Sequence, residues 1–274
     1  GRDARAAAGR RGVRAPPPRA AGGDMPAGTV LRLATPGELS SFDRARFPDG
    51  QPGLVHGLES AGLYRYAATT RQPETLSVEI ARDQAQEGWL CAHGHRVEFV
   101  MMGGQPRFAS CHLAIGNQLD GQPVPPGTWI QVDPAVRGQP IEQAGAGTGA
   151  RWLLRTEGSE PMDVEKLSLL KLELRLDARR QLLGFEGLLS RETTLGEMTY
   201  PAGTRVLSGG LRAAGAQPGD LLFSASRGRV ARRAGGTDVA AGSSVLQAPD
   251  GAVRAVLSNR DAGVLDVAAV RVGP

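Results

Sequence analysis

Two cysteines and three histidines form the one cluster in this sequence whose residue types suit a metal ion. Cys91, His93 and His95 alternate, so a β-strand would point all three side chains to one face, and Cys111 and His112 follow twenty residues later. Thiolate and imidazole ligands suit zinc or copper. The spacing fits no named zinc family, so Cys91, His93, His95, Cys111 and His112 are a hypothetical metal site without a family signature.

A disulfide between Cys91 and Cys111 is the alternative use of the same cysteines. In a plain hairpin centred near residue 104, Cys111 would face residue 98 and the two cysteines would not meet. In a coil of about 20 residues they would lie on adjacent rungs, within the Cα distance that a disulfide tolerates. Such a bond implies an oxidising compartment. Two unlinked thiols are the remaining possibility, and no cofactor is predicted.

A basic run, Ser224–Arg233, is a second candidate binding site. If the run is one strand, Arg227, Arg229 and Arg233 lie on one face and could hold a phosphate, an acidic glycan or a lipid head group. A solvated strand face or hairpin with no ligand is the alternative.

No catalytic motif is present, including a nucleophile elbow, a phosphate-binding loop and a dinucleotide glycine pattern. Glu79 and Glu98 could flank a sugar-binding groove if their strands were neighbours, because glycoside hydrolysis needs two carboxyl groups about 5–10 Å apart. His56 stands alone beside apolar residues and is interpreted as structural. These patterns favour a non-enzymatic protein over an enzyme.

A short turn followed by a strand recurs along the chain and predicts how these residues are positioned. Its fullest copy is Met198–Leu207, in which Pro-Ala-Gly predicts a β-turn and the β-branched residues after it predict a strand. The spacing of the copies is close to multiples of about 20 residues, which is typical of coiled β architectures. The predicted turn glycines are Gly28, Gly127, Gly203, Gly219 and Gly242.

The predicted fold is all-β, with many short strands, antiparallel or stacked as coils, and few helices. It would be built from divergent turn-strand repeats of about 20 residues, as a β-roll or solenoid or as a sandwich. One segment is ambiguous: we expect Val164–Leu176 to begin as a helical turn and continue as a strand. If the body divides into two halves, the boundary is expected near 137–163, which is rich in Gly and polar residues.

The positive charge is concentrated in the first residues. The chain carries +4, whereas residues 1–23 contain six Arg and one Asp, so the remaining 251 residues carry −1. Residues 1–24 are predicted to be a disordered basic tail ahead of a β-rich body, 25–274. A near-neutral body makes a nucleic-acid partner unlikely, although the tail together with Arg227–Arg233 could bind a polyanion weakly.

The predicted function is that of a non-enzymatic structural or binding module of a bacterial envelope or secreted protein. Another envelope protein or an acidic glycan is the expected partner. No run of about 18 apolar residues predicts a transmembrane helix. A periplasmic or extracellular location is favoured, with a cytoplasmic one as the alternative. A β-rich enzyme acting on polysaccharide is the rival function, and no family is identified from these patterns.

Overall fold

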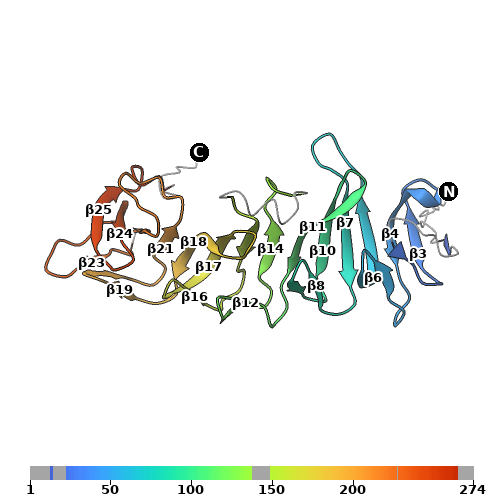
Figure 1. Cartoon of the computed structure of the whole chain (residues 1–274), viewed down its shortest axis with the longest axis horizontal. Coiled ribbons are helices and arrows are strands. Elements are labelled where there is room, and N and C mark those ends of the chain that lie inside the picture. The colour runs from blue at the N-terminus through green and yellow to red at the C-terminus, as the bar shows by residue number, and fades with distance from the viewer. Residues whose placement is uncertain (1–12, 15–22, 138–148, 227, 265–274) are drawn as a thin grey trace, which may run out of the picture. The chain divides into compact units, whose positions relative to one another are not determined.

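The computed structural model describes residues 13–14, 23–137, 149–226 and 228–264. It confirms the predicted all-β class: half of the chain is strand, and the helical element of the described part is the three-residue 3-10 turn η1 (Leu39–Ser41). The chain forms two compact units, Gly1–Ile115 and Gly116–Pro274 (Figure 1). The division therefore falls before the 137–163 segment, which lies within the second unit. Most of the expected tail lies outside the described residues.

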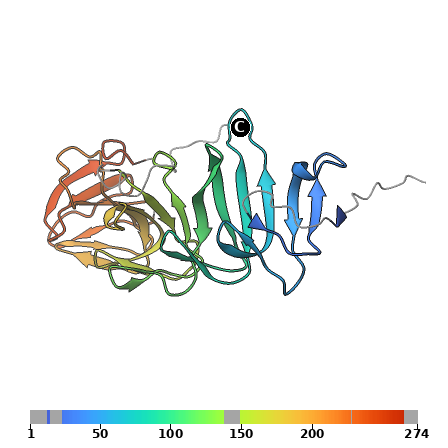
Figure 2. The same cartoon turned by 45° about the vertical axis from the view of Figure 1, so that its right-hand side comes forward.

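The first unit is built on an antiparallel sheet in the order β1-β3-β4-β6-β7-β10-β11. In Figure 2 its blue and green strands lie side by side. The strands are β1 (Val13–Arg14), β3 (Val30–Leu33), β4 (Phe42–Arg46), β6 (Leu58–Tyr66), β7 (Thr75–Ile80), β10 (Arg96–Met102) and β11 (Gln105–His112). Three short pieces complete the unit: β2 (Gly23–Asp24) pairs with β5 (Gly53–Val55), which pairs with β6, and β8 (Gln84–Gln86) pairs with β9 (Trp89–Cys91).

One face of this sheet is buried because apolar residues alternate along its central strands. In β7, Leu76, Val78 and Ile80 are at most 3% exposed, and Val78 is paired with Leu63 of β6 and Val97 of β10. Side chains on alternate residues of a strand point to the same side, so these residues build one apolar layer. The other face of the same strands carries the polar residues that form the groove described below.

The second unit continues as an antiparallel meander in the order β14-β15-β17-β18-β21-β22-β24-β25. Its strands are β14 (Trp129–Val132), β15 (Trp152–Arg155), β17 (Leu167–Leu176), β18 (Leu182–Leu189), β21 (Arg205–Ser208), β22 (Leu221–Ser224), β24 (Ser243–Gln247) and β25 (Val253–Ser258). The remaining strands are β12 (Gln118–Leu119), β13 (Gln122–Pro123), β16 (Met162–Val164), β19 (Thr193–Leu195), β20 (Met198–Tyr200) and β23 (Arg232–Arg233). Of these, β19, β20 and β23 form a separate small sheet.

The helical turn expected at the start of Val164–Leu176 is wrong, because this segment is a hairpin of β16 and β17. Glu165 and Lys166 form its turn with φ of +50° and +68°. A bulge near Lys171 (φ +48°) shifts the buried side from odd to even residues along β17. That shift places some leucines three or four residues apart, which imitates a helical pattern in the sequence.

The small sheet of the second unit packs on the meander through a buried aromatic pair and a polar contact. The ring of Tyr200 in β20 stacks on that of Phe223 in β22, with 4.0 Å between centroids. The Tyr200 hydroxyl donates to the Gln247 side chain, whose Nε2 donates to the carbonyls of Leu195 (3.1 Å) and Gly251 (2.9 Å). Both Tyr200 and Gln247 are buried away from water, and these hydrogen bonds supply the partners that their polar atoms need.

The turn before several strands is chemically the same. In three Pro-x-Gly-Thr turns the Thr hydroxyl donates to the Pro carbonyl at 2.7 Å, at Thr29, Thr128 and Thr204. These turns and two related ones contain the five glycines named from the sequence, whose φ values lie between +80° and +88°: Gly28, Gly127, Gly203, Gly219 and Gly242. Each precedes a strand by one or two residues. An L side chain at such φ is strained, which explains the choice of glycine.

Gly196 permits a second contact between the small sheet and the meander. A Cβ at this position would lie 2.3 Å from the Gly251 carbonyl oxygen, whereas a Cβ at Gly235 would meet nothing within 4 Å. Both glycines have positive φ, of +57° and +67°. We expect Gly235→Ala to cost about 1 kcal/mol from backbone strain alone. Gly196→Ala should cost at least about 2 kcal/mol more, because backbone must move.

Urea unfolding of the two variants checks this expectation, with Gly235→Ala as the control for strain. Equal losses in the two variants would mean that the close approach of Gly196 and Gly251 does not contribute to stability.

Candidate functional site

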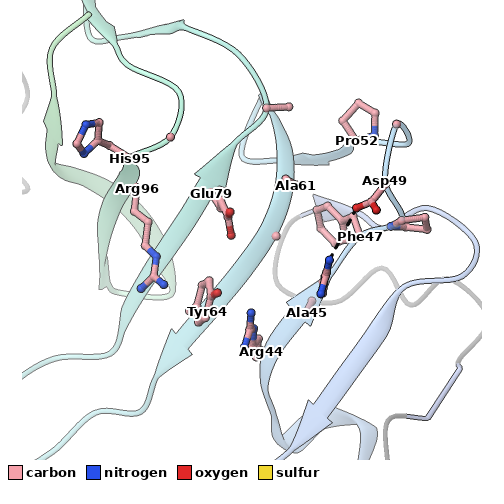
Figure 3. Close-up of a pocket in the computed structure, with 16 residues that line it drawn as sticks. Arg44, Ala45, Phe47, Asp49, Pro52, Ala61, Tyr64, Glu79, His95 and Arg96 are labelled. Atoms are coloured by element: carbon pink, nitrogen blue, oxygen red, sulfur yellow. Dashed lines mark ion pairs between the residues drawn. The ribbon is translucent and has the colours of Figure 1, made fainter. Parts of the chain in front are cut away.

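The first unit contains a groove of about 630 Å³ on the polar face of its sheet. Strands β4, β6 and β7 supply its floor, and two loops supply its rim: the one after β4 and the one between β9 and β10. Figure 3 shows Arg44, Tyr64, Glu79 and Arg96 directed into it. The volume lies within the roughly 300–1,000 Å³ range of small-ligand sites.

Strand register places these four side chains on one face. Arg44 of β4 is paired with Tyr64 of β6, and Gly62 of β6 with Glu79 of β7. Glu79 is in turn paired with Arg96 of β10. Directly paired residues share a face of the sheet, and so do residues two apart on one strand. The groove therefore draws one side chain from each of four adjacent strands.

Two guanidinium groups lie against one tyrosine ring in this groove. Arg44 Cζ is 4.9 Å and Arg96 Cζ is 3.9 Å from the centroid of the Tyr64 ring, which is the range of a cation–π contact. Arg96 reaches the ring diagonally across β7, where Glu79 is paired with Arg96 and the small Ser77 is paired with Tyr64. Within the described residues neither arginine forms an ion pair with a carboxylate, so each keeps N–H donors for a ligand.

Glu79 and Gly62 shape the middle of the groove. Glu79 is exposed, and its carboxylate lies above Gly62, where a Cβ would be 3.6 Å from Glu79 Oε2 and 3.0 Å from the Ala45 carbonyl oxygen. The missing side chain at Gly62 leaves the floor low. The groove thus presents the guanidinium groups of Arg44 and Arg96 beside the acceptor-only carboxylate of Glu79. Its other two charged residues, Arg46 and Asp49, form an ion pair with each other at 3.9 Å.

Glu98 lies beside the groove on the same face and is partly buried. The Ser77 hydroxyl donates to Glu98 Oε1 at 2.6 Å. Burial raises the pKa of this carboxyl, and the Ser77 hydrogen bond and the charge of Arg96 oppose that effect. Glu79 and Glu98 belong to the paired strands β7 and β10 and are diagonal neighbours on one face, so the two strands are adjacent as the carboxylate hypothesis requires.

The structure joins Cys91 and Cys111 in a disulfide, with 5.8 Å between their Cα atoms. The strands that it links are antiparallel, since Cys91 forms a bridge with Leu113. Adjacent coil rungs are therefore not the reason for the contact. The short hairpin of β8 and β9 returns the chain to β11, and Cys91 meets Cys111 diagonally across that pairing.

The three histidines of the hypothetical metal site do not converge with the cysteines as ligands. His93 Nδ1 contacts the Asp83 carboxylate, whose pKa is lowered by the hydrogen bonds from His93. The ring of His95 stacks on that of His112, with 4.4 Å between centroids. Both sulfurs are used in the disulfide, and no group of three or more His, Cys, Asp or Glu in the described part of the chain is arranged to hold a metal.

The described part of the basic run Ser224–Arg233 does not form one strand, so the condition for a single arginine face is not met there. Strand β22 ends at Ser224, and a turn follows in which the Arg229 N–H donates to the Ser226 carbonyl at 2.8 Å. Arg233 is paired with Glu197 at 2.7 Å. Arg227 lies outside the described residues.

His56 is located in the turn between β5 and β6, with φ of +48°. Its ring is 5.7 Å from that of Phe99, so this turn lies over the buried side of the sheet. Burial lowers the pKa of His56, which fits a neutral, structural side chain.

Sequence reasoning missed Arg44, Tyr64 and Arg96, and it treated Glu79 only as one of a carboxylate pair. The signal in the sequence is the set of polar residues that alternate with apolar residues along β6, β7 and β10. That signal shows which residues face solvent but not which strands are adjacent, so it could not assemble the groove.

No family model, curated protein or solved structure matches this chain. The described part of the chain contains no helix with the length and apolar character that crossing a membrane requires.

Loss of the disulfide should destabilise the first unit. The bond closes a loop between residues 20 apart, and constraint of the unfolded chain predicts a contribution of about 3 kcal/mol for a loop of this size. We expect Cys91→Ala/Cys111→Ala to lose this amount in urea unfolding. Wild-type protein unfolded in the presence of a reductant should lose a similar amount. Unchanged stability in both samples would contradict a structural role for the bond.

Glu98 should make stability depend on pH. Because burial raises the pKa of Glu98 in the folded state, its protonated form supports folding below the unfolded value of about 4.3, and this contribution is lost as pH rises through the folded pKa. Glu98→Gln is neutral throughout and can still accept from Ser77. We therefore expect the free energy of unfolding of Glu98→Gln, minus that of wild type, to be larger at pH 7 than at pH 4. Urea unfolding at the two pH values measures this difference. A difference that is constant across this range would contradict the assignment.

Proposed function

We propose that this chain is a non-enzymatic binding module of a bacterial cell-envelope or secreted protein, built on divergent turn-strand repeats. The observation that carries the proposal is the disulfide between Cys91 and Cys111, both of which are at most 1% exposed. Disulfides persist in oxidising compartments and are rare in the cytosol. The bacterial part of the proposal is supported by the excess of Arg over Lys and the abundant Ala, Gly and Pro, a composition that GC-rich coding produces.

The shared turn chemistry supports the repeat part of this proposal. Three Pro-x-Gly-Thr turns, with the same Thr-to-Pro hydrogen bond, each open a strand. Short two-residue hairpins with a positive φ at the first turn residue also recur, at His56, Glu87 and Asp120. A chain that reuses the same turn and hairpin presents a regular sheet surface, on which a groove can form between side chains of neighbouring strands.

A polysaccharide-acting enzyme is the second candidate, favoured by the adjacency of Glu79 and Glu98. The raised pKa of Glu98 suits a proton donor. Against it, Glu98 is engaged by Ser77 and is not among the residues that line the groove. The binding interpretation requires neither carboxylate to transfer a proton.

The test is cosedimentation of the purified, oxidised chain with washed bacterial envelopes, together with an assay for newly formed reducing sugar ends. We expect the chain to pellet with the envelopes and to release no reducing ends. Prior reduction of the disulfide should decrease the bound fraction, because the first unit loses its cross-link. Release of reducing ends would favour the enzyme, and absence of binding would overturn the module.

A further inference from the structure

We infer that the groove of the first unit binds an acidic sugar, with Arg44 and Arg96 holding the carboxylate and Glu79 accepting hydrogen bonds from hydroxyl groups. This inference rests on the proposed binding function and names the ligand class for one site. It begins from the two guanidinium groups that lie against the Tyr64 ring within one depression.

The arginines are oriented by the protein before a ligand arrives. Tyr64 contacts both guanidinium groups, and Arg96 Nη1 also donates to the Tyr66 hydroxyl at 3.4 Å. Arginine side chains otherwise lose considerable conformational entropy when they are fixed. Guanidinium groups bind carboxylates in a planar, two-point geometry, so a held pair of arginines is suited to an oxyanion.

Three other arginines of the first unit differ because they form ion pairs within the protein. Arg32 donates two hydrogen bonds to Asp43, at 2.6 and 2.9 Å, and Arg65 donates to Glu74. Arg82 is likewise paired with Glu59. Arg44 and Arg96 form no ion pair with a described carboxylate. The unpaired guanidinium groups in the groove are therefore the ones left for an external anion.

Glu79 favours an acidic sugar over a single phosphate or a chain of phosphates as the ligand. Its exposed carboxylate lies in the same groove, whereas the rim carboxylate of Asp49 forms an ion pair with Arg46. Carboxylates repel phosphate groups, whereas they accept hydrogen bonds from hydroxyl groups. Nucleic-acid binding depends on many phosphate contacts across a strongly positive surface. A ligand that carries one acid group and several hydroxyl groups matches this mixture of charges.

The groove is open at its rim and so accommodates a segment of a longer chain. Its rim residues Asp49, Gly50, Gly94 and His95 are exposed. The absence of a side chain at Gly62 keeps the floor low beneath the Glu79 carboxylate. An acidic oligosaccharide can lie along this depression while the polymer continues into solvent at either end.

The experiment is titration calorimetry of the full chain with trigalacturonate, with maltotriose as the neutral probe. The test variant is Arg44→Gln/Arg96→Gln. Its matched control is Arg71→Gln/Arg107→Gln, which removes the same charge from exposed residues of the first unit outside the groove. We expect binding of trigalacturonate to weaken by at least about tenfold in the test variant and by less than about twofold in the control.

Glu79→Gln separates an acidic sugar from a simple anion. It should weaken binding of trigalacturonate, because one charged acceptor for hydroxyl groups is lost. Binding of inorganic phosphate or a short single-stranded DNA at least as tight as that of trigalacturonate would overturn the assignment, as would tighter trigalacturonate binding by Glu79→Gln.

Equal losses of trigalacturonate affinity in the test and control variants would also overturn the assignment. So would binding of maltotriose that is as tight as that of trigalacturonate. No binding of trigalacturonate would overturn the ligand class, while the cosedimentation of the chain with envelopes would still test the binding module independently.

Discussion

The register of β7 between β6 and β10 is the constraint on which the first unit depends. Side chains alternate along a strand, so a shift of one residue would move Leu76, Val78 and Ile80 from the buried face to the solvent face. The same shift would move Glu79 out of the groove. Burial of the apolar set therefore fixes the position of the polar set, and the groove forms as a consequence of the core.

Two local features hold this register from outside β7. The disulfide ties β9 to β11 at the edge of the sheet, and the Gln84 side chain bonds both backbone groups of Glu59 at 2.8 and 2.7 Å. Each joins a short hairpin to a long strand. The groove rim between β9 and β10 begins only three residues after Cys91, so the cross-link also limits where that rim can lie.

In the second unit, buried polar contacts hold the strands in place, whereas the first unit uses a disulfide. Tyr200 and Gln247 are fully buried and bond each other, while Gln247 also binds the turns that contain Leu195 and Gly251. A buried amide without partners would be costly, so this arrangement favours one placement of the small sheet. The close approach of Gly196 and Gly251 requires that same placement.

The sequence by itself determined the all-β class, the alternation in β7 and the turns at residues such as Gly203, because glycine conformation, proline geometry and period-two patterns are local properties. It misjudged the start of β17, where the bulge at Lys171 disguised the strand period. It named Cys91 and Cys111 as a possible pair but relied on the wrong geometry. Only the tertiary structure decided that Arg44, Tyr64, Glu79 and Arg96 share one groove, because adjacency of β4, β6, β7 and β10 depends on successive pairings between residues up to 25 apart in the sequence. Such pairings are fixed by burial and backbone hydrogen bonding across the whole sheet.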